Sequence, residues 1–336
     1  LLNALLRDPD LADTVVIVNE FGEVGLDHLL VETAEDGMVL LSAGCLCCTV
    51  RGDLVATLED LLARRDDGRI LPFRRVVIET TGLADPAPVL AAVLFHPRLS
   101  RRYAVEGVVT VVDAVAGSDT LARHEEARRQ VAVADRIVLS KGDLAEPSAG
   151  LLDRLAALAP GAPVIPAVSG AVPAARLLSG GLFGADGKIG DVREWLRAEE
   201  RETQHDHHHH HRHDVSRHSD AIRSLVLRAD APIREAALDL FLDMLRSTAG
   251  PKLLRLKGLV ALARDPGRPL LIQGVQHVVH VPALLDTWPD GDRGTRIVVI
   301  LDDVPEGAVR RMWNAFAGRP APDQPDGAAL ADNPLA

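Results

Sequence analysis

All three cysteines of the chain fall within four residues, at Cys45, Cys47 and Cys48. Thiolates favour soft or borderline ions such as Zn²⁺, Cu⁺ or Co²⁺ over Mg²⁺ or Ca²⁺. Three buried, inert cysteines are the alternative, but chance rarely gathers every cysteine of a protein into one motif. A disulfide is disfavoured because the count is odd and the neighbours are too close to bridge comfortably. The spacing therefore predicts a metal site in a reducing cytoplasm.

A second set of metal-binding side chains lies in the histidine-rich segment 205–213, which includes His207, His209 and His211. Imidazole is mostly neutral at pH 7 and can then bind metal ions. The segment predicts a low-affinity reservoir for several ions. A solvated spacer is the alternative.

Polar residues follow four short apolar runs in the first half of the chain. Continuous β-branched runs are typical of parallel strands that are buried on both faces. The runs cover residues 14–18, 75–78, 108–112 and 136–139, with a helix expected over 51–65. The residues that follow them are Asn19 and Glu20, the segment 79–82, Asp113, and the segment 140–143. Because ligands of parallel α/β folds bind beyond the carboxyl ends of the strands, we expect these four ends to converge on one site.

Two of these strand ends carry nucleotide-binding chemistry. Lys141 and Asp143 have the spacing of guanine-specific sites, in which the carboxylate accepts hydrogen bonds from guanine N1 and N2 and the lysine stem lies along the base. Glu79 can hold a Mg²⁺ water, and the amide of Gly82 can face a γ-phosphate. The alternatives are a solvated loop for Lys141 and an ordinary N-cap before a helix near Pro86.

The composition changes along the chain and predicts four regions. They are an α/β domain over residues 1–185, a His-rich linker over 186–219, a smaller α+β domain over 220–317 and a disordered tail over 318–336. In the smaller domain we expect strands over 221–227, 253–262, 269–281 and 295–301, and a helix over 232–246.

Length and charge exclude some classes of protein. The 336 residues are 47% hydrophobic, which is ample for buried cores. The formal net charge of −11 argues against a nucleic-acid partner. No apolar run approaches the ~20 residues of a membrane span, so we expect a soluble, cytoplasmic protein.

In combination these motifs resemble those of the CobW-type GTPases, a family of P-loop metal chaperones that includes the zinc-regulated GTPase metalloprotein activators. The segments that carry the resemblance are 19–27, 44–54, 78–86 and 140–144, followed by 256–258, 273–277, 288–289 and 295–296. Their order and combination cover most of the chain.

The resemblance implies a mostly parallel P-loop GTPase domain and a smaller α+β C-terminal domain. It implies GTP hydrolysis with Mg²⁺, catalytic roles for Glu79 and Gly82, and nucleotide binding by Lys141, Asp143 and Ser169. It implies a possible homodimer, and delivery of Zn²⁺ or Co²⁺ to a client metalloprotein, with GTP hydrolysis gating release of the ion. Three thiolates leave a fourth metal position, which water, a carboxylate such as Glu23, or a histidine could fill. Cobalt delivery for cobalamin synthesis, a non-catalytic metal buffer and a redox role of the cysteines remain alternatives to a zinc chaperone.

One feature of the family is not found in the 336 residues, namely its Gly-x-x-x-x-Gly-Lys-Thr loop. Residues 1–6 resemble the helix that follows this loop, so we expect the chain to start just after it. The amides and lysine of such a loop compensate most of the charge of a triphosphate. We therefore expect the full-length protein to hydrolyse GTP and this chain to bind GTP poorly or not at all.

Overall fold

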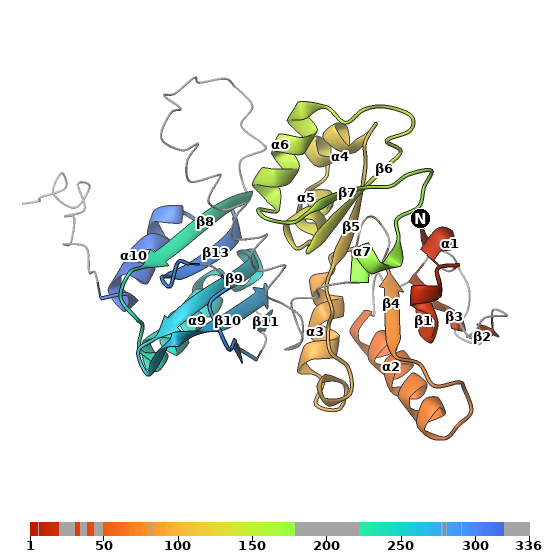
Figure 1. Cartoon of the computed structure of the whole chain (residues 1–336), viewed down its shortest axis with the longest axis horizontal. Coiled ribbons are helices and arrows are strands. Elements are labelled where there is room, and N and C mark those ends of the chain that lie inside the picture. Colours follow the sequence, from red (N-terminus) through yellow and green to blue (C-terminus); the bar gives the residue numbers. More distant parts are fainter. Residues whose placement is uncertain are drawn as a thin grey trace, which may run out of the picture.

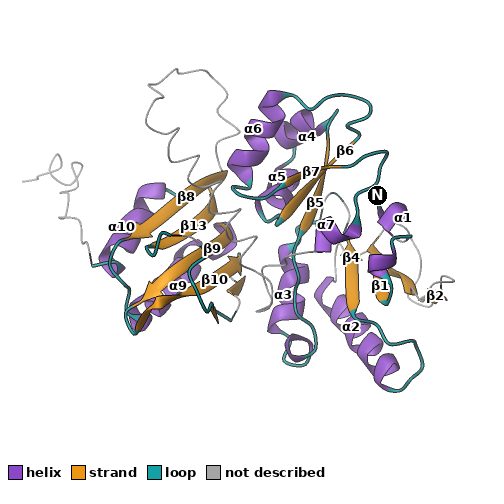
Figure 2. Cartoon of the chain, in the orientation of Figure 1, coloured by secondary structure: helices purple, strands orange, loops and turns teal. Residues whose placement is uncertain are grey.

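The computed structural model of the chain describes residues 1–5, 7–19, 31–33, 39–43, 50–80, 82, 84–178, 222–276, 278–279, 281–289 and 291–318. The described residues form three sheets with helices packed on them (Figures 1 and 2). Two sheets belong to the first half of the chain, and the third belongs to the C-terminal part.

Strand β1 of the first sheet is buried on both faces, as its continuous apolar run predicts. Its strands, in spatial order, are β2 (Val31–Thr33), β3 (Val39–Ala43), β1 (Thr14–Asn19) and β4 (Arg75–Glu79). Strand β1 is parallel to β3 and β4, whereas β2 is antiparallel to β3. Val15 and Ile17 of β1 pack with helices α2 (Val50–Asp66) and α3 (Ala87–Phe95). Val16, which points to the other face, packs with α1 (Leu2–Leu5) and α7 (Ala174–Leu178).

The second sheet is entirely parallel. Its strands are β5 (Val109–Asp113), β6 (Arg136–Ser140) and β7 (Val164–Pro166), in this order. Helices α4 (Gly117–Arg123), α5 (Glu125–Ala132) and α6 (Ala149–Leu158) form a core with it.

The four predicted runs all form strands, but they do not share one sheet. Among the described residues, β4 pairs only with β1 and β5 pairs only with β6, so both are edge strands. On β5 the side chains of Val109 and Val111 are accordingly 39% and 52% exposed. The structure places the four strands as two pairs in two sheets, and the convergence of their four ends on one site stays a prediction.

The third sheet is antiparallel, as expected for the C-terminal domain. Its main strands are β8 (Ile222–Ala229), β9 (Leu253–Leu262), β10 (Asp265–Val275) and β13 (Thr295–Asp302), with the short β11 (Val278–Val279) and β12 (Ala283–Leu284) paired to β10. Helix α9 (Glu235–Ala249) begins later than predicted, beyond Pro232, and ends directly before Gly250. Helix α10 (Glu306–Phe316) was not predicted.

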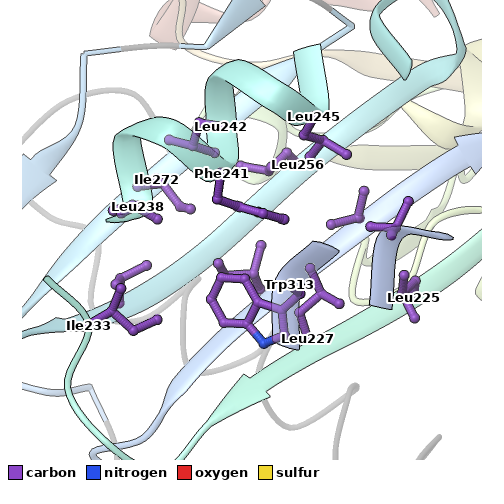
Figure 3. Packing of buried hydrophobic residues seen from close by; sticks show 14 of the residues in the cluster. Leu225, Leu227, Ile233, Leu238, Phe241, Leu242, Leu245, Leu256, Ile272 and Trp313 are labelled. Atoms are coloured by element: carbon purple, nitrogen blue, oxygen red, sulfur yellow. The ribbon is translucent and has the colours of Figure 1, made fainter. Parts of the chain in front are cut away.

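Helices α9 and α10 cover one face of this sheet and supply its aromatic core (Figure 3). The rings of Phe241 and Trp313 meet edge to face with centroids 4.9 Å apart. The indole nitrogen of Trp313 donates to the carbonyl of Arg228 at 3.0 Å. Strands β9 and β13 approach so closely that a Cβ at Gly258 would lie 2.8 Å from the carbonyl oxygen of Arg296. Only glycine fits at that position.

The other face of the third sheet packs against the first half of the chain around a buried ion pair. The side chain of Asp135, between α5 and β6, is 2% exposed and pairs with Arg255 and with Lys257, whose Nζ lies 3.0 Å from Oδ1. The amide of Val108 donates to the second carboxylate oxygen at 2.8 Å, and Arg255 also donates to the carbonyl of Val133. Both partner cations come from β9, so the pair joins two parts of the chain.

Burial and neighbouring charges both shift the pKa values of Asp135 and Lys257. Burial would raise the pKa of Asp135, but the charges of Arg255 and Lys257 outweigh it and hold this pKa well below its usual range. Burial, together with the charge of Arg255, lowers the pKa of Lys257 to about 7. The three side chains therefore depend on one another for their charge states.

Replacing Asp135 by asparagine should destabilise the protein by about 3–5 kcal/mol, because two buried cations lose their compensating charge. The measurement is the midpoint of chemical denaturation. The control is Asp303→Asn, which removes an exposed ion pair with Lys252 and should cost less than about 1 kcal/mol. Equal midpoints for the two variants would contradict a central role for Asp135.

Candidate functional site

The carboxyl ends of β5 and β6 bring Asp113 and Lys141 together. Asp113 lies opposite Ser140 in the parallel register, and its Oδ2 is 2.6 Å from Nζ of Lys141. Its other oxygen accepts hydrogen bonds from the amides of Val115 at 2.8 Å and Ala116 at 3.2 Å. The carboxylate is thus held by the turn before α4, and it fixes the direction of the Lys141 side chain.

The backbone turns sharply directly after β6. Lys141 has a φ of 59°, which is uncommon for a residue with a side chain, and its carbonyl accepts from the amide of Leu144 at 3.0 Å. Asp143 is exposed on this turn. A Cβ built at Gly142 would meet no described heavy atom within 4 Å. The turn therefore presents Lys141 and Asp143 at an open edge of the second sheet.

Ser169 lies on the loop after the neighbouring strand β7. It has a φ of 50°, Gly170 has a φ of 76°, and Val168 and Ala171 exchange two backbone hydrogen bonds of 2.9 Å around them. The amide of Ala167 donates to the carbonyl of Leu139 at 2.9 Å, so this loop starts beside the end of β6. Three of the predicted nucleotide-binding residues, Lys141, Asp143 and Ser169, therefore follow adjacent parallel strands.

Glu79 and Gly82 follow β4, which belongs to the other parallel sheet. Glu79 is the last residue of β4, opposite Val18 of β1, and is exposed. Gly82 is exposed, and a Cβ at this position would meet no described heavy atom within 4 Å. The loop ends at Asp85, whose Oδ1 accepts from the amide of Ala87 at 2.9 Å and caps α3. The N-cap residue itself, Pro86, makes no side-chain hydrogen bond, so Asp85 supplies the acceptor at the start of α3.

All seven predicted metal ligands lie outside the described residues. They are Cys45, Cys47, Cys48, Glu23, His207, His209 and His211. Among the residues that the structure describes, no group of three or more His, Cys, Asp or Glu side chains is placed to hold a metal ion. The metal site therefore remains a prediction from the sequence.

The contact between Lys141 and Asp113 has an electrostatic consequence. The hydrogen bond from Lys141 lowers the pKa of Asp113 below its usual range, against the opposing effect of burial, and the amides of Val115 and Ala116 lower it further. Asp113 was recognised in the sequence only as a polar residue at a strand end. The parallel pairing of β5 with β6 is the signal that could have placed Asp113 beside Ser140. The ion pair between Asp113 and Lys141 was not predicted.

Two family profiles together match most of the chain. Residues 1–166 match the profile described as the CobW/HypB/UreG nucleotide-binding domain, and residues 222–317 match the cobalamin synthesis protein cobW C-terminal domain. The zinc chaperone YjiA of Escherichia coli is 33% identical over 319 residues, which are 95% of this chain and 93% of that protein. The chain belongs to the CobW family.

Further relatives match nearly the whole chain or part of it. The zinc chaperone CobW of a Sinorhizobium species is 33% identical over 94% of this chain and 92% of its own length. The zinc-regulated GTPase metalloprotein activator 1 of Schizosaccharomyces pombe is 33% identical over 43% of this chain and 36% of that protein. The crystal structure of Zn(II)-bound YjiA GTPase from E. coli has a TM-score of 0.66 at 28% identity, and covers 90% of this chain and 89% of that one. These similarities support a GTPase metallochaperone.

A membrane span was not expected from the sequence. In the described part of this CobW-family chain, no helix is both long enough and apolar enough to cross a bilayer.

Replacing Lys141 by glutamine should raise the pKa of the Asp113 carboxyl toward its usual value, because the carboxylate loses the cation that stabilises it. The pKa is measured by NMR titration of the carboxyl carbon. Lys252→Gln, which removes a cation remote from β5, is the control and should leave this titration unchanged. An unchanged Asp113 titration in Lys141→Gln would contradict the ion pair.

Proposed function

We propose that this chain is a GTP-dependent zinc chaperone, in which nucleotide state governs whether Cys45, Cys47 and Cys48 hold the ion tightly. The observation that carries the proposal is the open edge of the second sheet, where Asp113 fixes Lys141 and the same turn exposes Asp143. This arrangement suits a guanine base. Similarity to zinc chaperones over nearly the whole chain supports zinc as the cargo.

The guanine would be recognised by charge and by shape. Asp143 offers two acceptor oxygens to the N1 and N2 donors of guanine, a donor pair that adenine lacks. Lys141 would lie along the base with its ammonium group held by Asp113 at 2.6 Å. Ser169, on the adjacent loop after β7, would complete the base site. The predicted selectivity is therefore for guanine nucleotides.

Glu79 and Gly82 would act at the phosphate end of the nucleotide. Glu79 is an exposed carboxylate at the end of β4, and hard cations such as Mg²⁺ prefer oxygen ligands. Mg²⁺, when bound, neutralises charge on the β- and γ-phosphates. The open space at Gly82 leaves room for its amide to face the γ-phosphate. Within the 336 residues no Gly-x-x-x-x-Gly-Lys-Thr loop assists them, so we expect weak GTP binding by this chain.

Zinc would be the cargo of the cysteine motif, with Glu23 or water completing a tetrahedral site. His207, His209 and His211 would hold further ions more weakly. The recipient would be a client metalloprotein in the cytoplasm, and a homodimer is a further expectation.

A non-catalytic metal buffer is the second candidate function. The histidine-rich segment favours it. The guanine-type turn at Lys141 and Asp143 disfavours it, since a buffer has no use for a base-specific site.

Replacing Asp143 by asparagine should weaken GDP binding by about tenfold to 150-fold, the loss of a charged hydrogen-bond acceptor worth about 1.5–3 kcal/mol. Affinity for xanthosine diphosphate should rise, because the asparagine amide can donate to the C2 carbonyl that replaces the amino group of guanine. Both affinities are measured by NMR titration of the 336-residue chain with millimolar nucleotide. Asp153→Asn, an exposed carboxylate on α6, is the control. Equal affinities of Asp143→Asn and the unmodified chain for both nucleotides would contradict a guanine site.

Replacing Cys45, Cys47 and Cys48 by serine should reduce zinc affinity by at least about a hundredfold, because a serine hydroxyl is a poor zinc ligand compared with a thiolate. The measurement is competition with a chromophoric chelator. Replacing His207, His209 and His211 by alanine is the matched comparison and should lower the number of bound ions while keeping the tight site. Retention of tight zinc binding by the serine variant would contradict the thiolate site.

A further inference from the structure

The loop that follows Glu79 contacts the C-terminal domain through the side chain of Gln276. Nε2 of Gln276 donates to Oδ2 of Asp85 at 3.0 Å. Asp85 uses its other oxygen to cap α3 through the amide of Ala87 at 2.9 Å. The end of the loop and the first turn of α3 are therefore attached to a residue 191 positions further along the chain.

Gln276 is held in place by its own backbone. It directly follows β10, has a φ of 51°, and its amide donates to the carbonyl of Leu254 at 3.2 Å. A left-handed conformation is costly for glutamine and persists only where the surroundings enforce it. The side chain is half-buried. The donor that meets Asp85 is thus rigidly presented by the β10 end of the third sheet.

Helix α5 reinforces the same loop from the side. Nε2 of Gln130 donates to the carbonyl of Ala84 at 2.7 Å. Next to Gln130, Arg129 forms two ion pairs. Its Nη1 lies 3.9 Å from Oδ2 of Asp85, and its Nη2 lies 2.8 Å from Oδ2 of Asp302 on β13. Arg129 therefore connects the loop to a second strand of the C-terminal domain.

Apolar packing lies close to these polar contacts. Ala87 and Leu90 of α3 form one buried cluster with Val133 and with Val275, the residue before Gln276. A shift of the loop cannot leave this cluster and the polar contacts unchanged, because packed interiors respond in discrete rearrangements.

We propose that Gln276 is a positioning residue that transmits the state of the Glu79 loop to the C-terminal domain. The proposal deepens the function proposed above, since the loop carries Glu79 and Gly82 at the phosphate end of the nucleotide. Loss of a γ-phosphate would move the loop and loosen the contact between Asp85 and Gln276. The C-terminal domain would then respond to hydrolysis without touching the nucleotide.

The test is hydrogen exchange of the 336-residue chain without nucleotide, followed over residues 84–95. Gln276→Asn shortens the side chain by one methylene and tolerates a positive φ, so it removes the contact without adding backbone strain. Gln276→Leu removes the donor at similar length. We expect about tenfold faster exchange at the start of α3 in both variants, the low end for loss of a hydrogen bond to a charged acceptor. Exchange at the rate of the unmodified chain in both variants would overturn the proposal.

A charge exchange distinguishes a specific contact from general loosening. Gln276→Glu places a carboxylate against Asp85 and should accelerate exchange further. Adding Asp85→Asn should restore slow exchange, because the asparagine amide donates to the new carboxylate while its carbonyl still caps Ala87. Failure of this second change to slow the exchange would overturn the proposal.

A separate arm of the experiment addresses the proposed function. GDP titration of a protein in which the strand and Gly-x-x-x-x-Gly-Lys-Thr loop of a CobW-family protein are joined ahead of Leu1 reports the guanine site, because the 336-residue chain is expected to bind nucleotide weakly. This titration requires no substitution at Gln276. If exchange follows the pattern above while GDP does not bind, the positioning role of Gln276 stands and the proposed function fails. If GDP binds while exchange is unchanged in every variant, the reverse holds.

Discussion

Asp135 is buried between the parallel sheets and the C-terminal sheet, and its charge is compensated by Arg255 and Lys257 from across that boundary. Removing a carboxylate from water is costly unless its partners and hydrogen bonds are well placed. Here the amide of Val108 supplies a further hydrogen bond at 2.8 Å. This requirement fixes how β9 sits against the loop between α5 and β6, and the other contacts between the two parts of the chain depend on that placement.

The placement has consequences at the candidate site. With β9 held against Asp135, the neighbouring strand β10 ends where Gln276 reaches Asp85, and β13 brings Asp302 to Arg129. The loop after Glu79 is thus bounded by the C-terminal domain, whereas the turn at Lys141 is set by Asp113 within the second sheet. A guanine base and a γ-phosphate would therefore be recognised by elements that are held differently: the first by a turn within one sheet, the second by a loop that contacts both domains.

The features that could be predicted from the sequence are those that depend on a local pattern of residues. Continuous apolar runs identified β1, β4, β5 and β6, and motif order identified the family. The three-residue strand β2 has too short a pattern to be recognised, and the edge positions of β4 and β5 depend on pairing that no run reveals. Contacts of Asp135 with Arg255 and of Asp85 with Gln276 join residues 120 and 191 positions apart, which periodicity cannot anticipate. The ligand set at Cys45, Cys47 and Cys48 rests on residue chemistry alone.

The most direct test of the account is the zinc affinity of the chain in different nucleotide states. A strand and a Gly-x-x-x-x-Gly-Lys-Thr loop of a CobW-family protein would be joined ahead of Leu1, and zinc affinity measured by chelator competition with Mg²⁺ and either a non-hydrolysable GTP analogue or GDP. The account predicts that the GTP analogue tightens zinc binding by about 5-fold to 150-fold relative to GDP, the usual range of coupling between two sites. Equal zinc affinity in both states, with both nucleotides bound, would contradict it.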